Sequence, residues 1–240
     1  MSEDLLVFPG GGRLRSVDER DRNHLLPPPR AAAPTGTARV YRHWYAPPAL
    51  DQGRSSSCVG HGCHMLLRAA PVLNNKGIPD PYQIYNEAQL IDEWPGIDPE
   101  VEGTSVRAGI KTLKAHGYIS SYRWAFDGPT AVNHILNVSP VVVGWSWHEG
   151  MMSVDDFGFI YPKGRMVGGH CVIVVGCNTL DKCPDGNIGS ATLVNSWGGN
   201  WGRKGRAKIS LKAFDELTRD YGEVAAVFET LKPTEVPAVS

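Results

Sequence analysis

The pattern of hydrophobic and polar positions changes character halfway along the chain. In the first half, three segments that mix apolar and polar residues are bounded by residues that cap or stop helices. They predict helices over 58–70, 81–94 and 105–116. In the second half, short runs rich in β-branched and aromatic residues predict strands over 138–147, 169–177, 191–197, 205–210 and 224–231. Helices followed by strands indicate an α+β protein with a helical lobe and an antiparallel sheet lobe.

The first 37 residues have no such pattern. The segment 27–37, PPPRAAAPTGT, is rich in proline and alanine and has no hydrophobic period. It cannot bury enough apolar surface to offset the entropy lost on ordering. We interpret 1–37 as a disordered or extended N-terminal arm, too short to fold as an inhibitory domain. The folded domain is expected over 38–240, with the helical lobe at about 50–130 and the sheet lobe at about 131–230.

Composition narrows the functional classes. A net charge of −1 gives no reason to expect a nucleic-acid or anionic-membrane partner. No apolar run approaches the roughly 20 residues that a membrane span needs. The N-terminus does not read as a secretory signal, and five cysteines, an odd number, do not indicate a disulfide framework. These features predict a cytoplasmic protein.

Three short segments carry chemistry-bearing residues in order along the chain. In DQGRSSSCVGHG, Gln52 lies six residues before Cys58. In GGHCVIVVG, His170 begins an apolar strand, and in VNSWGGNWGRKG, Asn195 precedes a serine and a tryptophan. Each segment alone is a weak signal, because a lone buried cysteine is usually an inert small hydrophobe. Their order and spacing together are a stronger one.

Over roughly residues 38–230 these segments resemble the papain family of cysteine peptidases. The third motif matches at every family position, namely Asn195, Ser196, Trp197, Gly198, Trp201, Gly202 and Gly205. His170 and Asn195 follow Cys58 by 112 and 137 residues, so the histidine comes earlier than is usual in the family. The chain also departs from the family at Ser55, which stands in place of a disulfide cysteine, and at Val59, which replaces a tryptophan.

The resemblance implies a fold and a set of roles. The fold is two lobes, one helical and one β-barrel-like, with the active cleft between them. Cys58 would be the nucleophile, His170 its general base and Asn195 the residue that orients the histidine. Gln52 would donate to the oxyanion together with the Cys58 backbone N–H. Gly103 would lie along the substrate backbone, and Trp197 would cover the histidine–asparagine bond.

Such a site cleaves peptide bonds through an acyl-enzyme and needs no cofactor and no metal. A thiolate attacks the carbonyl, and a helix N-terminus and a neighbouring imidazolium both lower a cysteine pKa. Cys58, at the start of a predicted helix, is therefore expected to be activated. The expected partner is a peptide or protein substrate, and whether the arm docks onto a further partner stays open.

Other interpretations compete with an active peptidase. Cys58, His61, Cys63 and His64 are crowded like zinc ligands, but on a helix they point in different directions. A peptidoglycan cross-link hydrolase would use the same nucleophile. A catalytically dead relative would serve as a structural or binding module, with the arm docking it into a larger assembly. The missing disulfides and signal suit a bacterial or phage protein, virion-associated in the second case.

Overall fold

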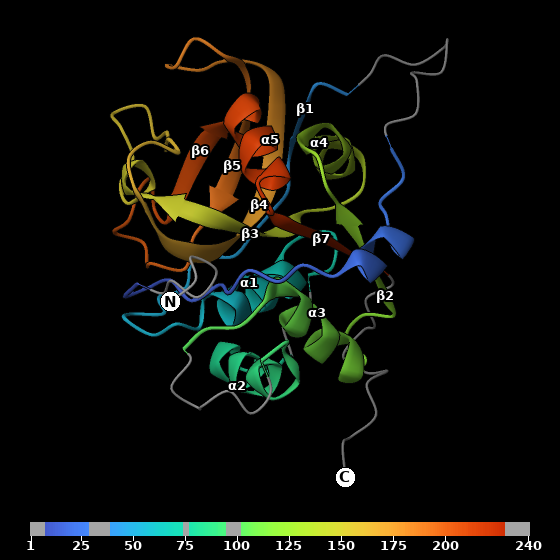
Figure 1. Ribbon diagram of the computed structural model, residues 1–240. Helices are drawn as coiled ribbons and strands as arrows, with labels where there is room; N and C mark the ends of the chain where they lie inside the picture. Colours follow the sequence, from blue (N-terminus) through green and yellow to red (C-terminus); the bar gives the residue numbers. More distant parts are fainter. Residues whose placement is uncertain (1–7, 29–38, 74–76, 95–101, 229–240) are drawn as a thin grey trace.

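The structure, a computed structural model, describes residues 8–28, 39–73, 77–94 and 102–228 (Figure 1). Within them, antiparallel strands form one sheet in the order β2-β7-β3-β4-β5-β6, and β1 also pairs with β4. The strands are β1 (Tyr41–His43), β2 (Ser121–Ala125), β3 (Val141–His148), β4 (Met166–Lys182), β5 (Ile188–Val194), β6 (Arg206–Ser210) and β7 (Glu223–Phe228). The sheet is open rather than closed into a barrel, with β2 and β6 at its two ends.

The α-helices are α1 (Cys58–Arg68), α2 (Pro81–Ile91), α3 (Val106–Ala115), α4 (Gly128–Asn137) and α5 (Leu211–Arg219), with short 3-10 turns at η2 (Glu19–Asn23) and η3 (Glu149–Met151). Side chains of Asp80, Ser105, Asp127 and Ser210 cap the first turns of α2 to α5. Helix α1 differs, because Ser57 makes no capping hydrogen bond. Its first turn begins directly with Cys58.

The sheet separates two hydrophobic cores because successive side chains of a strand point to opposite faces. On β3, Val141, Val143 and Trp145 belong to a core that includes residues of α4 and α5. Val142, between them, belongs to a second core with residues of α1 and α3. Figure 1 shows α1, α2 and α3 gathered on one side of the molecule and α5 beside β5 and β6 on the other. The predicted helical and sheet lobes are thus joined through the central strands.

The predicted α+β architecture is confirmed, and most predicted elements are present. The predicted helices over 58–70, 81–94 and 105–116 correspond to α1, α2 and α3. Sequence analysis missed α4, α5 and β2. Helix α4 had a readable signal, since Asp127 caps it and Pro129 lies in its first turn. Strand β4 is longer than its apolar run, because its polar second half pairs with β1 and β5.

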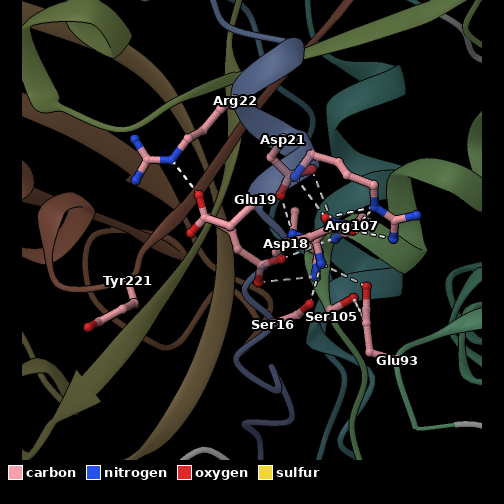
Figure 2. Close-up of polar contacts among 12 residues, drawn as sticks. Ser16, Asp18, Glu19, Asp21, Arg22, Glu93, Ser105, Arg107 and Tyr221 are labelled. Atoms are coloured by element: carbon pink, nitrogen blue, oxygen red, sulfur yellow. Dashed lines mark hydrogen bonds and ion pairs between the residues drawn. The ribbon is translucent and has the colours of Figure 1, made fainter.

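The described part of the N-terminal arm, residues 8–28, packs against the domain; 1–7 and 29–37 lie outside the described residues. Leu14 and Leu26 are buried, and Leu26 donates its N–H to the Trp124 carbonyl at 2.8 Å. Figure 2 shows the main polar anchor, the guanidinium of Arg107 on α3. It binds Asp21 of η2, Ser16 and Glu93, the last at 2.8 Å.

Arg107 is almost fully buried, with a side chain 3% exposed. Burial acts to lower its pKa, but the hydrogen bonds that it donates to Asp21 and Glu93 outweigh this and raise the pKa. Because two carboxylates share one buried guanidinium, the cation holds both the arm and the segment that follows α2. The arm is therefore attached to the domain by charge as well as by apolar contacts.

Removing this cation tests the anchor. In Arg107→Met, Asp21 and Glu93 lose their shared partner, and we expect the free energy of unfolding to fall by about 3 kcal/mol. The arm should also be cut faster in limited proteolysis. Arg20→Met is the matched control, because Arg20 pairs with Asp18 at the surface with its own side chain 83% exposed. Equal stability and equal proteolysis of the two variants would contradict the assignment of Arg107 as the anchor.

Candidate active site

Strand pairing brings His170 and Asn195 together. His170 lies on β4, and Asn195 follows the last residue of β5, the neighbouring strand. The His170 Nε2 and Asn195 Oδ1 atoms are 2.6 Å apart. The same Oδ1 accepts the Ser196 N–H at 2.8 Å, which fixes it as an acceptor. His170 Nε2 therefore carries the hydrogen, and Nδ1 keeps its lone pair.

Two tryptophans hold the His170 ring. Trp197 stacks on it, with ring centroids 4.7 Å apart and planes inclined by 30°. Trp147, on β3, meets it edge-on at 4.7 Å. The resemblance implied that Trp197 covers the histidine–asparagine bond, and in the structure its ring stacks on the histidine. Trp147 is an additional wall to which sequence analysis assigned no role.

Cys58 occupies the first position of α1 and is fully buried. Its neighbourhood includes the backbone N–H groups of Cys171, next to His170, and of Val59. The thiol thus lies at an uncapped helix N-terminus beside the residue that follows His170. Among the described residues His170 Nδ1 has no hydrogen-bond partner, so no thiol–imidazole hydrogen bond forms in this state.

Gln52 is connected to the third motif through Ser196. Its Oε1 accepts from Ser196 Oγ at 2.6 Å, and its backbone N–H donates to the Ser196 carbonyl at 2.8 Å. The other end of the side-chain amide, Nε2, donates to the carbonyls of Ser55 at 2.7 Å and Gly11 at 3.2 Å. Sequence analysis gave Ser196 no role, although its place between Asn195 and Trp197 was the available signal.

The chain's own residues 8–14, here called the cleft segment, lie across these groups. The Gly10 carbonyl accepts from Trp197 Nε1 at 2.6 Å, and the Gly11 carbonyl accepts from Gln52. Phe8 sits edge-on to Trp197 with ring centroids 6.1 Å apart. The cleft segment therefore covers the side chains that the resemblance assigned to catalysis.

The cleft segment continues as a strand-like stretch between two backbone edges. The N–H groups of Gly12 and Arg13 both donate to the Gly169 carbonyl, at 3.1 and 3.2 Å. On the other side Thr104 N–H donates to Gly12 at 2.9 Å, and Leu14 N–H donates to Thr104 at 2.9 Å. This pairing with Thr104 is parallel. Main-chain hydrogen bonds to Gly169 on one side and to Thr104 on the other thus hold the cleft segment in place.

Glycines make this close approach feasible. A Cβ on Gly103 would lie 2.5 Å from the Gly12 carbonyl oxygen, and Gly103 has a φ of +106°. A Cβ on Gly12 would lie 2.0 Å from the Ser56 carbonyl oxygen. Gly103 therefore lies along a peptide backbone, and here that backbone belongs to the same chain. Sequence analysis missed this role of the Gly10-Gly11-Gly12 run.

Covering the site shields its residues from solvent and shifts the pKa values of Cys58 and His170. Cys58, His170 and Asn195 have no exposed surface. Burial raises the pKa of Cys58 to about 12, although the N–H groups of Cys171 and Val59 act in the opposite direction. Burial lowers the pKa of His170 to about 4, with the Asn195 hydrogen bond opposing. Near neutral pH this state therefore holds a thiol and a neutral imidazole, not the ion pair expected from the sequence.

The alternative zinc site is not assembled in the described part of the chain, where no cluster of three or more His, Cys, Asp or Glu side chains could hold a metal ion. Instead, the Nδ1 atoms of His61 and His64 form hydrogen bonds with the backbone carbonyls of Ser57 and Pro79, respectively. The helices of the described residues are also too short or too polar to cross a membrane.

Comparison with curated proteins finds distant cysteine-peptidase relatives. An uncharacterized peptidase C1-like protein of Acanthamoeba polyphaga mimivirus is 24% identical, over 76% of this chain and 71% of that protein. A cathepsin B-like cysteine proteinase of Caenorhabditis elegans is 25% identical over 45% of this chain, and the match spans 27% of that proteinase. No protein-family model matches the chain.

Comparison with solved structures identifies the fold. Xylellain, a cysteine protease from Xylella fastidiosa, superposes with a TM-score of 0.70 at 16% identity, covering 95% of this chain and 98% of that one. Digestive procathepsin L2 from Tenebrio molitor superposes with a TM-score of 0.64 at 15% identity, covering 95% and 81%. The chain has the papain-like cysteine peptidase fold, and the resemblance inferred from the sequence is confirmed.

A full-length variant that cannot seat the cleft segment should uncover the site. In Gly12→Ala the added Cβ meets the Ser56 carbonyl, so we expect the segment to leave the cleft and Cys58 to react at least tenfold faster with iodoacetamide near neutral pH. Gly186→Ala is the matched control, since Gly186 also has a positive φ, of +84°, and a Cβ there meets nothing within 4 Å. Peptide mass mapping identifies the labelled cysteine. Equal labelling of Cys58 in the two variants would show that residues 8–14 do not protect it.

Proposed function

We propose that this protein is a cysteine peptidase in which Cys58 attacks the scissile carbonyl, His170 acts as general base and Asn195 orients the histidine. The observation that carries the proposal is the 2.6 Å His170–Asn195 hydrogen bond, which leaves the Nδ1 lone pair of the histidine available as a base. The cysteine-peptidase relatives support the same class of reaction.

The steps follow from these positions once the cleft segment has left. The Cys58 thiol passes its proton to His170 Nδ1, and the thiolate forms a bond with the carbonyl carbon. The oxyanion receives hydrogen bonds from Gln52 Nε2, which releases the Gly11 carbonyl, and from the Cys58 backbone N–H. His170 then protonates the leaving amine as the peptide bond breaks. Water, deprotonated by His170, hydrolyses the thioester and regenerates the thiol.

Exposure of the cleft also restores the proposed activation of the nucleophile. Burial is the largest cause of both pKa shifts, raising that of Cys58 and lowering that of His170. Water entering the cleft reduces both effects, so the thiol pKa falls while the imidazole pKa rises. The helix N-terminus then favours the thiolate further. The thiolate–imidazolium pair accordingly belongs to the uncovered state.

Two other functions remain distinguishable by experiment. A peptidoglycan cross-link hydrolase would release fragments from purified peptidoglycan but leave casein intact. A dead binding module would hydrolyse neither and would use the N-terminal arm to bind another protein. The peptidase proposal is supported over the module because the described part of the arm contacts the cleft of its own chain. Fractionation of the source cells tests the predicted cytoplasmic location.

Replacement of the nucleophile is the first test. Cys58→Ser in the Gly12→Ala background should fold normally and lose nearly all hydrolysis of casein, because His170 does not ionise a serine hydroxyl. Cys63→Ser is the matched control, since Cys63 is equally buried on the same helix and plays no part in the mechanism. Activity that survives Cys58→Ser but not Cys63→Ser would mean that the nucleophile is wrongly assigned.

The supporting residues should lose activity in a defined order. Gln52→Ala should lower kcat by about 10²–10³ and leave labelling of Cys58 by a thiol-directed epoxide nearly unchanged, because it serves the oxyanion. Asn195→Ala should cost less, since it orients the base rather than reacting. Steady-state kinetics with one peptide substrate measures both. A larger loss of kcat for Asn195→Ala than for Gln52→Ala would contradict these roles.

A further inference from the structure

Four neighbouring strands form the floor of a second pocket, with a volume of about 310 Å³. None of the four residues proposed for catalysis is among those that line it. Across β1, β4, β5 and β6 the strand register aligns His43, Gly176, Thr192 and Lys208. A Cβ on Gly176 would lie 2.9 Å from His43 Nδ1, so the glycine leaves room for that ring. The floor of the pocket is therefore built into the sheet.

The pocket carries an excess of positive charge. Three arginines and a lysine line it together with one carboxylate, namely Arg42, Arg203, Arg206, Lys208 and Asp181. Asp181 already has partners, because it accepts from Lys208 Nζ at 2.8 Å and from Ser190 Oγ at 2.7 Å. Within the described ranges no carboxylate pairs with any of the three arginines. Their charge is thus not neutralised by the chain around them.

Arg206, on β6, shows this imbalance most clearly. Its Nη2 donates to the carbonyls of Ala46 at 3.1 Å and Pro47 at 3.3 Å, which are neutral acceptors. Its Nη1 is buried and has no hydrogen-bond partner in the described part of the chain, and the same holds for Arg42 Nε. Burial lowers the pKa of Arg206, and burial together with the Arg206 charge lowers the pKa of His43. An anion in the pocket would offset the cost of this unbalanced charge.

Arg203 and Lys208 supply the cationic groups that an anion can contact directly. The Lys208 side chain is 42% exposed, and Arg203 is also exposed. Arg203 donates one N–H to the Asp156 carbonyl, which leaves further N–H groups of its guanidinium for a ligand. Its stem packs over Gly158, where a Cβ would lie 3.1 Å from Arg203 Cγ. The loop before β4 therefore holds this guanidinium at the edge of the pocket.

Two exposed aromatic residues line the same pocket. Tyr41 of β1 is 61% exposed, and Phe157 is 73% exposed. The Phe157 N–H donates to Asp155 Oδ1 at 2.9 Å, so the backbone that carries the ring is fixed by a turn. A flat apolar group of a ligand gains contact area and ring–ring interactions against such side chains. The pocket thus offers an apolar surface beside its cations.

We propose that this pocket binds a small phosphate monoester that carries a flat apolar ring, with the phosphate at Arg203 and Lys208 and the ring against Tyr41 or Phe157. Four cations against one carboxylate leave more than a single positive charge, which favours a dianion over a carboxylate ligand. The three terminal oxygens of a phosphate also match the N–H fork of a guanidinium. The inference does not depend on the proposed peptidase function.

Calorimetric titration of the full-length protein at physiological ionic strength tests the chemistry of the ligand. Phenyl phosphate, inorganic phosphate and benzoate are the probes, because they carry both groups, only the phosphate, or the ring with a single negative charge. We expect phenyl phosphate to bind about tenfold more tightly than inorganic phosphate, through packing of its ring. It should also bind more tightly than benzoate. No binding of phenyl phosphate at millimolar concentration, or an affinity equal to that of either other probe, would overturn the proposal.

Variants assign the binding to this pocket. Arg203→Gln should weaken phenyl phosphate binding roughly 10- to 100-fold, as the loss of a charged hydrogen bond predicts. Arg123→Gln is the matched control, because it removes the same charge from an exposed residue of β2, at the opposite end of the sheet from β6. It should leave the affinity unchanged.

The aromatic side of the pocket has its own test. Phe157→Ala combined with Tyr41→Ala should weaken phenyl phosphate and leave inorganic phosphate unchanged, because only the ring loses its contacts. Thermal unfolding of each variant checks that the domain is intact, and all three positions are exposed. Equal losses of affinity in Arg203→Gln and Arg123→Gln would show a general electrostatic attraction and overturn the proposal. Unchanged affinity in Arg203→Gln would place the ligand elsewhere and overturn it as well.

Discussion

The pairing of β4 with its two neighbours is the constraint on which the site depends. The register with β3 sets Trp147 beside the His170 ring, and the register with β5 delivers Asn195 to its Nε2. A one-residue slip of β4 would turn His170 to the opposite face of the sheet. Apolar side chains on both faces make such a slip costly, because they fill a core on each side. The geometry of the proposed base is thus specified by the packing of the whole sheet.

Ser196 links Gln52 to Asn195. Its hydroxyl orients Gln52, and its N–H holds the oxygen of Asn195 that accepts from His170. One residue therefore fixes both the proposed oxyanion donor and the residue that orients the proposed base. The three consecutive residues Asn195, Ser196 and Trp197 thus all act on one site, the tryptophan by stacking on His170.

The fold and the candidate residues could be predicted from the sequence to different degrees. Helices α1 to α3 were predictable because capping residues and glycine or proline stops bound them locally. Helices α4 and α5 were missed because they lie among strands, where neighbouring signals favour a sheet. Cys58, His170 and Asn195 were found from three spaced motifs. The position of residues 8–14 was not, because glycines carry no hydrophobic pattern and the pairing partners are more than 80 residues away.

The covered cleft has a consequence for the redox chemistry of the protein. Peroxides and disulfides react with thiolates rather than with neutral thiols, and they need access to the sulfur. With the segment in place Cys58 is both buried and protonated, and the other four cysteines are buried as well. The covered chain is therefore a form in which the proposed nucleophile is protected from oxidation. An open cleft would expose that sulfur to oxidants and to substrate alike.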